Sequence, residues 1–327
     1  MPPEHEALLI LTRQRFPALA DCPCEVEPIL KGGSDRRFYR FTWAGGAQPP
    51  MVLMIYTQAR RDNARFVPTT RRLAALGAHV PAILGFDEQR LFVWLEDLGR
   101  DDLHSHRDDP WEARRPLYLS ALAEAAKIHS VGEDDLTSAD IAEMEPGFDE
   151  GLYEWEQNYF LEHFVRGYLR RETDTSEVQP AHEALSALRS GLATLPRCLV
   201  HRDFQSQNIL LRDGAAWLVD YQGLRPGLAG YDLASLLFDP YVTLGRAERH
   251  ELLEHYAGLR GLALPDLRGV VYQCAAQRLM QALGAYANLS RNQGKTHFEQ
   301  HIPSGVRNLA GVCDEIPALS PLRGFFC

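Results

Sequence analysis

The residues best suited to chemistry lie in one stretch about two thirds of the way along the chain. It reads His-Arg-Asp-Phe-Gln-Ser-Gln-Asn over 201–208, and Asp220 follows after two apolar runs. These runs flank Asp213-Gly214, which favours a tight turn between antiparallel strands because glycine tolerates a positive φ. If the turn centres on Gly214, Asn208 and Asp220 lie opposite each other at the open end of a hairpin, roughly 5 Å apart.

This arrangement predicts a magnesium site for phosphoryl transfer. The amide oxygen of Asn208 and the carboxylate of Asp220 are ligands that Mg²⁺ prefers. Asp203 lies in the loop that leads into the hairpin, where its carboxylate can orient a hydroxyl and accept its proton. We therefore predict Asp203 as the catalytic base, with Asn208 and Asp220 as metal ligands. A plain hairpin with solvated acids at its ends would explain any one of these residues taken alone.

The pattern H-x-D-x-x-x-x-N, followed by a hairpin and an aspartate, resembles the catalytic and metal loops of the aminoglycoside phosphotransferase family of small-molecule kinases. The likeness continues into Gly-Tyr-Asp-Leu-Ala at 230–234. The resemblance implies a two-lobed, α+β, protein-kinase-like fold that uses ATP and Mg²⁺. It also implies that His201 and Asp232 support the catalytic loop, and we assign Gln205 to substrate binding. Asp232 at a helix start is alternatively a charge favoured by the helix dipole.

A second segment, 31–40, lies between two β-type runs and predicts nucleotide binding. Backbone N–H groups at Gly32, Gly33 and Ser34 could approach phosphates, although a Gly-Gly pair is often only a turn. Residues 34–40 resemble the corresponding loop of the anomeric kinases that phosphorylate N-acetylmuramate and N-acetylglucosamine in bacterial cell-wall recycling. By the same resemblance, backbone groups near Glu96 and Leu98 would meet the adenine edge.

The sequence departs from most kinases of this fold in the nucleotide lobe. These kinases place a lysine on the third strand and pair it with a glutamate on the next helix. Here the third run, 51–56, has no Lys, and the helical stretch 62–76 has no Glu. Because the lysine and the glutamate are both absent, neither residue is left as a buried charge without its partner. Four basic residues could supply the missing positive charge: Lys31, Arg36, Arg37 and Arg40. Alternatively, they are solvated residues at the edge of a strand. We assign Arg40 to the nucleotide site.

The acceptor side is indicated by resemblance. Phe148-Asp149, Glu156 and Phe160 have the aromatic-Asp, Glu and Phe spacing of the acceptor-side helix in the anomeric amino-sugar kinases, although Glu154-Trp155 replaces two expected basic residues. Glu156 is the predicted partner of a sugar hydroxyl, and an exposed helical glutamate is the alternative. The stretch 133–156 holds ten acids and no Lys or Arg, which fits either a cation pocket or a solvated face.

The predicted secondary structure changes from β-strands to helices along the chain. Short β-type runs dominate the first hundred residues and long amphipathic stretches the remainder, such as 111–129, 149–171, 229–244 and 269–289. We therefore expect a small β-rich nucleotide-binding lobe over residues 1–97 and a mainly helical catalytic and acceptor-binding lobe over residues 98–327.

Composition limits the possible partners. The 327 residues carry 34 Lys plus Arg against 44 Asp plus Glu, a net charge of −10 that disfavours nucleic acid. No apolar run approaches the roughly 18–20 residues of a membrane span, and residues 1–16 lack the apolar centre of a signal peptide. We expect a cytoplasmic protein with no membrane contact and no obligate protein partner.

These observations predict an ATP-dependent small-molecule kinase that phosphorylates a sugar hydroxyl, specifically the anomeric hydroxyl of N-acetylmuramate or N-acetylglucosamine. The alternatives are an aminoglycoside or amino-alcohol phosphotransferase and a non-catalytic nucleotide-binding scaffold. A protein kinase is disfavoured because the chain has no full G-x-G-x-x-G loop and no Ala-Pro-Glu segment after Asp220.

Overall fold

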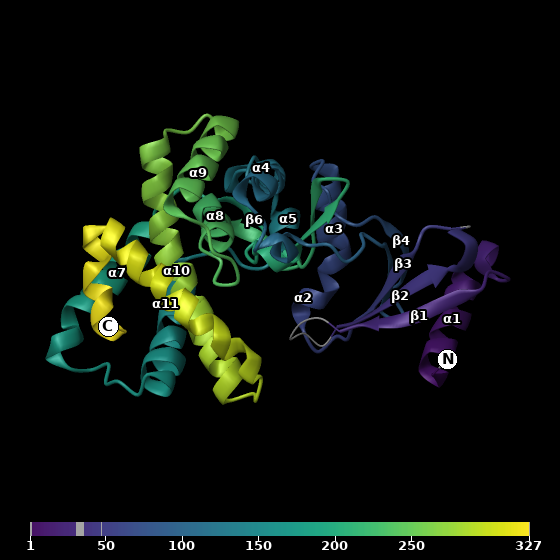
Figure 1. Ribbon diagram of the computed structural model, residues 1–327, viewed down its shortest axis with the longest axis horizontal. Helices are drawn as coiled ribbons and strands as arrows, with labels where there is room; N and C mark the ends of the chain where they lie inside the picture. The colour runs from purple at the N-terminus through teal and green to yellow at the C-terminus, as the bar shows by residue number, and fades with distance from the viewer. Residues whose placement is uncertain (1, 31–35, 47, 327) are drawn as a thin grey trace.

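The computed structural model describes residues 2–30, 36–46 and 48–326. Two parts follow one another along the long axis of the molecule (Figure 1). One contains an antiparallel sheet and few helices, and the larger one is built mainly of helices. This arrangement confirms the predicted two-lobed α+β fold.

The smaller lobe is built on a five-stranded sheet with the order β1-β2-β3-β5-β4, in which every neighbouring pair is antiparallel. The strands are β1 (Cys24–Ile29), β2 (Arg37–Trp43), β3 (Met51–Ile55), β4 (Ile83–Asp87) and β5 (Phe92–Glu96). The helices are α1 (Pro3–Arg15), α2 (Arg61–Ala64) and α3 (Phe66–Ala75).

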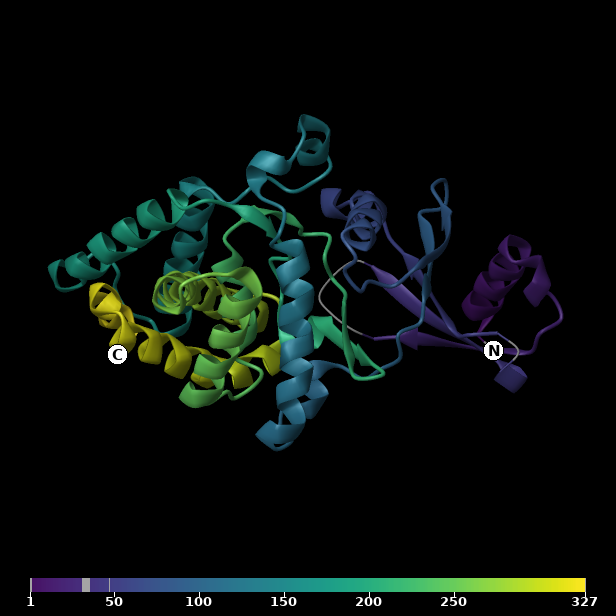
Figure 2. The same cartoon turned by 90° about the horizontal axis from the view of Figure 1, so that it is seen from above.

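Alternation along the central strands gives this sheet two apolar faces. Leu53 and Trp94 pack in a cluster with α1, whereas Met54 and Val93 belong to the main core with α3. Successive side chains of a strand point to opposite faces, so β3 and β5 need a helix on each side. Accordingly, α1 covers the outer face and α3 lies toward the helical lobe (Figure 2).

The larger lobe packs its helices around the long helix α10. The helices are α4 (Trp111–Ile128), α5 (Ser138–Ala142), α6 (Glu150–Tyr159), α7 (Gln179–Ala193), α8 (Ala229–Leu237), α9 (Arg246–Arg260), α10 (Leu264–Arg291) and α11 (Ile302–Glu315). Two short antiparallel pairs interrupt them: β6 (Cys198–Val200) with β9 (Arg225–Gly227), and β7 (Ile209–Arg212) with β8 (Ala215–Leu218). The site residues lie in and around these two pairs.

Two predicted helices have different limits in the structure. The stretch 149–171 contains α6 and then a π-helical segment, Phe160–Tyr168. The stretch 229–244 is helical only to Leu237. It stops two residues before Asp239-Pro240, because a proline disfavours helical geometry in the residue that precedes it.

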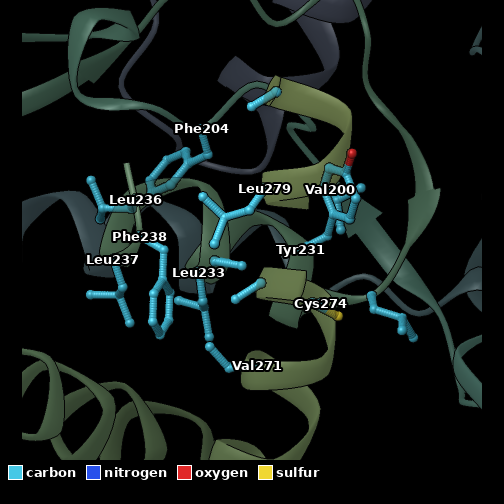
Figure 3. Close-up of a cluster of buried hydrophobic side chains, with 14 of the residues drawn as sticks. Val200, Phe204, Tyr231, Leu233, Leu236, Leu237, Phe238, Val271, Cys274 and Leu279 are labelled. Carbon is cyan, nitrogen blue, oxygen red and sulfur yellow. The ribbon is translucent and has the colours of Figure 1, made fainter. Parts of the chain in front are cut away.

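Helix α8 is buried along its length and places the chemistry-bearing loop on the core. Its residues 230–237 are all buried. Leu233 and Leu236 of α8 lie in the same cluster as Phe204 of the loop and Leu279 of α10 (Figure 3). Gly230 permits this approach, since a Cβ there would lie 3.1 Å from both Cys274 Sγ and a Val270 methyl carbon.

In the part of the chain that the structure describes, no helix is both long and apolar enough to span a lipid bilayer.

We predict that Gly230→Val destabilises the protein by about 1–3 kcal/mol, because the added atoms overpack the contact between α8 and α10. Unfolding in urea measures the change. Gly258→Ala is the matched control, since a Cβ at Gly258 in α9 meets nothing within 4 Å. That variant should be about 0.5–1 kcal/mol more stable than the parent. Equal stability of the parent and Gly230→Val would contradict the packing argument.

Candidate active site

The loop 201–208 is fastened to the core by a buried carboxylate. Asp232, in the first turn of α8, accepts hydrogen bonds from the backbone N–H groups of His201 (2.6 Å) and Arg202 (2.8 Å). Nε2 of His129 lies 3.0 Å from Asp232 Oδ2, and its Nδ1 lies 2.7 Å from the Tyr256 hydroxyl. Arg202 has a φ of +77°, a left-handed conformation that costs energy in a residue other than glycine. The carboxylate therefore stabilises a strained turn immediately before Asp203.

Two further buried side chains fix the same loop. His201 is fully buried, and its Nε2 lies 3.1 Å from the carbonyl oxygen of Val219, beside Asp220. Asp239 accepts hydrogen bonds from the N–H (2.9 Å) and the hydroxyl (2.6 Å) of Ser206. The role of Asp239 was not predicted from the sequence. The available signal was an acidic residue directly after a continuous apolar run, where an unpaired carboxylate would be costly.

Asp203 is ionised and accessible. Its side chain is 31% exposed, Oδ2 accepts a hydrogen bond from Arg202 Nη1 at 3.0 Å, and Oδ1 lies 3.8 Å from Arg278 Nη2. Burial raises the pKa of Asp203, but the charges of Arg202 and Arg278 outweigh this effect and hold the pKa below its usual value. At neutral pH the carboxylate can thus accept a hydrogen bond from an incoming hydroxyl.

The hairpin register corrects one expectation. Arg212 pairs with Ala215, so Asn208 lies opposite Val219 and not opposite Asp220. The backbone carbonyl oxygen of Asn208 accepts a hydrogen bond from the Val219 N–H at 3.0 Å. The turn has two residues, Asp213 and Gly214, both with positive φ (54° and 76°), instead of being centred on the glycine. Such turns match the twist of the flanking strands. Asp220 follows one residue beyond the pairing, with a φ of +64° that redirects the chain.

Two oxygens with the right chemistry for Mg²⁺ remain available at this place. Asn208 donates through Nδ2 to the carbonyl oxygen of Asp203 at 2.9 Å, which leaves Oδ1 as its acceptor. Asp220 Oδ1 accepts from Arg36 Nη2 (2.6 Å) and Gln222 Nε2 (2.9 Å), and no donor among the described residues contacts Oδ2. Within residues 2–30, 36–46 and 48–326, no cluster of three His, Cys, Asp or Glu could hold a metal alone. Two protein oxygens suit a Mg²⁺ ion, which usually completes its shell with water and phosphate.

The structure distinguishes the basic residues near the nucleotide lobe. Arg36, 7% exposed, points to Asp220. Arg37 instead pairs with Glu4 of α1 at 2.6 Å, on the exposed side. Arg40 binds both carboxylate oxygens of Asp97 (2.6 and 2.9 Å).

The prediction of Arg40 as a nucleotide ligand is corrected on this geometry. Its Nη2 also donates to the carbonyl oxygen of Gly99 at 2.7 Å, so its guanidinium fastens β2 to the segment that joins the lobes. Lys31 lies outside the described residues, as do Gly32, Gly33 and Ser34.

The segment after β5 keeps unused backbone groups. Glu96 ends β5, and its side chain pairs with Arg212 of the hairpin. Leu98 is buried, yet neither its N–H nor its carbonyl oxygen makes a hydrogen bond to the described residues. An unpaired donor and acceptor on one residue are what an adenine edge requires.

Glu156 is an interior residue, which corrects its assignment to a sugar hydroxyl. It is 1% exposed, and its two oxygens accept from the Tyr231 hydroxyl (2.8 Å) and Gln277 Nε2 (3.0 Å). Because the side chain is enclosed, a ligand in the site does not reach these oxygens. The alternative expectation, an exposed helical glutamate, is wrong as well. Gln205, the other predicted substrate residue, is partly buried, and its Oε1 lies 3.4 Å from Arg278 Nη2.

The sequence comparison identifies the family. The model of the phosphotransferase enzyme family matches residues 25–268. The chain belongs to this family. It is 28% identical over 317 residues to an N-acetylmuramate/N-acetylglucosamine kinase of Pseudomonas aeruginosa, covering 92% of this chain and 87% of that protein. It is 26% identical to a kinase of the same name from Neisseria meningitidis, with coverages of 88% and 85%.

Solved structures show the same fold in this family. A choline/ethanolamine kinase family protein from Mesorhizobium loti has a TM-score of 0.65 and 18% identity, with 98% of this chain and 99% of that chain covered. The ADP-bound aminoglycoside phosphotransferase APH(2'')-Ib has a TM-score of 0.61 and 12% identity, with 95% and 99% covered. At these identities the likeness concerns the fold alone.

We predict that Glu156→Gln leaves the KM for an acceptor within about threefold, because this side chain does not reach ligands. Burial raises the pKa of Glu156 in the folded protein, although hydrogen bonds from Gln277 and Tyr231 oppose the shift. The folded state therefore holds this proton more tightly, and stability falls as pH rises from the unfolded glutamate pKa to the folded one.

The Gln variant lacks this loss, so its stability relative to the parent should increase over the same pH range. Urea unfolding at a series of pH values measures the difference. A large rise in acceptor KM with unchanged stability would show that Glu156 contacts the substrate.

Proposed function

We propose that this chain transfers the γ-phosphoryl group of ATP to the anomeric hydroxyl of N-acetylmuramate or N-acetylglucosamine. The observation that carries the proposal is the position of Asp203: it lies in the loop that Asp232 fixes, and this loop leads into the hairpin whose open end holds the unused oxygens of Asn208 and Asp220. Relatives that match most of the chain and are named as kinases of these two sugars support the acceptor.

In the proposed reaction the acceptor hydroxyl donates a hydrogen bond to Asp203. Its oxygen forms the new bond to the γ-phosphorus as the bond to the ADP oxygen breaks, and its proton passes to the Asp203 carboxylate. Arg202, bonded to Asp203 Oδ2, holds that carboxylate in place. Asp232 contributes indirectly, as a positioning residue for the loop.

Asn208 Oδ1 and Asp220 Oδ2 would hold the Mg²⁺ ion. A bound ion at this position neutralises negative charge on the phosphates. Leu98 would present its N–H and carbonyl oxygen to the adenine edge, with the lobes meeting near residue 97. The use of ATP fits a cytoplasmic enzyme.

Arg36 is the proposed replacement for the lysine that β3 lacks. β3 (Met51–Ile55) contains no lysine, and α2 and α3 contain no glutamate. Arg36 is buried beside Asp220, so its guanidinium is placed where nucleotide phosphates would meet the metal ligands. Its planar donors suit phosphate oxygens.

We expect Asp203→Asn to lower kcat by about 10²–10⁴-fold, because the amide cannot accept the hydroxyl proton. Titration calorimetry should show Mg·ADP binding within about threefold of the parent. Asp134→Asn, at an exposed position outside the site, serves as the control and should keep full turnover. Undiminished turnover by Asp203→Asn would disprove the assignment of the base.

Arg36→Ala should weaken ADP binding about tenfold or more, since a charge-assisted contact to phosphate is lost. Binding of adenosine, which has no phosphate, should stay unchanged. Arg37→Ala is the matched control, because Arg37 is the next residue along the chain but pairs with exposed Glu4 of α1, away from Asp220. Calorimetry with both ligands tests the proposal, which fails if the two arginine variants behave alike.

A further inference from the structure

Three arginine side chains gather around Asp203 on the side of the helical lobe. Arg202 contacts Asp203 directly, and Arg278 of α10 lies 3.8 Å from it. Arg225 begins β9, and its Nε donates to the carbonyl oxygen of Gly223 at 3.0 Å. Gly223 itself is adjacent to the reacting group, since a Cβ there would lie 3.9 Å from Asp203 Oδ2 and 3.3 Å from Arg202 Cδ.

Arg225 is a buried cation without an anion. The residue is 8% exposed, and none of the described carboxylates lies within 4.0 Å of its guanidinium. Among the described residues, the guanidinium otherwise contacts the ring of Phe148, whose centroid is 5.4 Å from Cζ. Burial, together with the charge of Arg202, lowers the pKa of Arg225 to about 10. A buried charge without an ion-pair partner is costly, and the two terminal nitrogens of Arg225 are not fully enclosed, so a ligand can reach them.

The nearby carboxylates do not supply that compensation. Asp203 is shared by Arg202 and Arg278. Glu156 accepts from Tyr231 and Gln277, and Asp239 accepts from Ser206 and Tyr241.

Two other arginines of this lobe, one buried and one partly buried, have hydrogen-bond acceptors for their terminal nitrogens. Arg114 pairs with Glu248 and also donates to two carbonyl oxygens. Arg249 donates to the Leu237 carbonyl oxygen and to Asn308 Oδ1. For Arg225, by contrast, no acceptor among the described residues meets the two terminal nitrogens. The arrangement around Asp203 therefore has an excess of positive charge that the chain itself does not balance.

We propose that Arg225, with Arg202 and Arg278, binds a carboxylate of the acceptor while an acceptor hydroxyl faces Asp203. This proposal rests on the proposed function and deepens it. Of the two sugars, N-acetylmuramate carries a lactyl carboxylate and N-acetylglucosamine carries none. Asp203 and Arg202 are both partly exposed, so a ligand can reach the group of arginines from the site. Such a site would bind the anionic acceptor more tightly than the neutral one, and it would repel a polycationic acceptor.

The test compares three acceptors in the full-length protein: N-acetylmuramate, its methyl ester and N-acetylglucosamine. The ester keeps the shape of the lactyl group and removes its charge. We expect the parent protein to have a KM about tenfold or more lower for the acid than for the ester, as for a charge-assisted contact. In Arg225→Gln this preference should fall below about threefold, while KM and kcat for N-acetylglucosamine stay within about threefold of the parent.

Arg249→Gln is the control, since it removes a partly buried arginine of α9 that lies outside this group, and it should preserve the preference for the acid. If Arg225→Gln does not fold, the acid and ester comparison in the parent still decides, because equal KM values overturn the proposal. Arg225→Gln that lowers kcat equally for both sugars also overturns it, because the guanidinium then acts on the transferring phosphoryl group. Absence of turnover with all three acceptors rejects the proposed function, and the carboxylate site with it.

Discussion

The hydrogen bonds from two consecutive backbone N–H groups to Asp232 are the constraint on which the site depends. Arg202 adopts a left-handed backbone conformation between these bonds and Asp203. A turn of this kind persists only where its surroundings over-determine it. Asp232 can do so because it is fixed in turn by His129 and by its place in α8, which is buried on all sides. The packing of α8 in the helical core therefore stabilises the loop 201–208 through Asp232.

The site separates two kinds of charge across this loop. On the nucleotide side, Arg36 and Asp220 pair with each other and leave one carboxylate oxygen for a ligand. On the acceptor side, the arginines outnumber the carboxylates that they can reach. In the proposed site this distribution would favour an anionic acceptor, whereas the fold is shared with a choline/ethanolamine kinase family protein and an aminoglycoside phosphotransferase. Specificity in such a fold depends on the charges placed near the base and not on the fold itself.

The sequence predicted those features that local chemistry controls. The α+β fold class followed from short β-type runs replaced by long amphipathic stretches, and the hairpin followed from Asp213-Gly214. The register was misjudged by one residue because a two-residue and a glycine-centred turn have the same composition and differ only in φ. The role of Arg40 was misjudged for a related reason. The sequence around Arg40 on β2 does not reveal its partner Asp97, which follows β5, three strands later in the chain.

What the sequence determined by itself was the set of reactive groups and their order along the chain, because H-x-D-x-x-x-x-N and the aspartate after the hairpin are close in sequence. Only the tertiary structure decided which side chains face the site. Glu156 had a plausible spacing but became interior, since burial depends on how α6 packs against α8 and α10. Arg278 lies 3.8 Å from Asp203 and Arg225 is near enough for its charge to act on the same carboxylate, although the two arginines are 53 residues apart, and no local pattern encodes that convergence. Charges separated by such distances in sequence are brought together by the core, whose packing is a property of the whole chain.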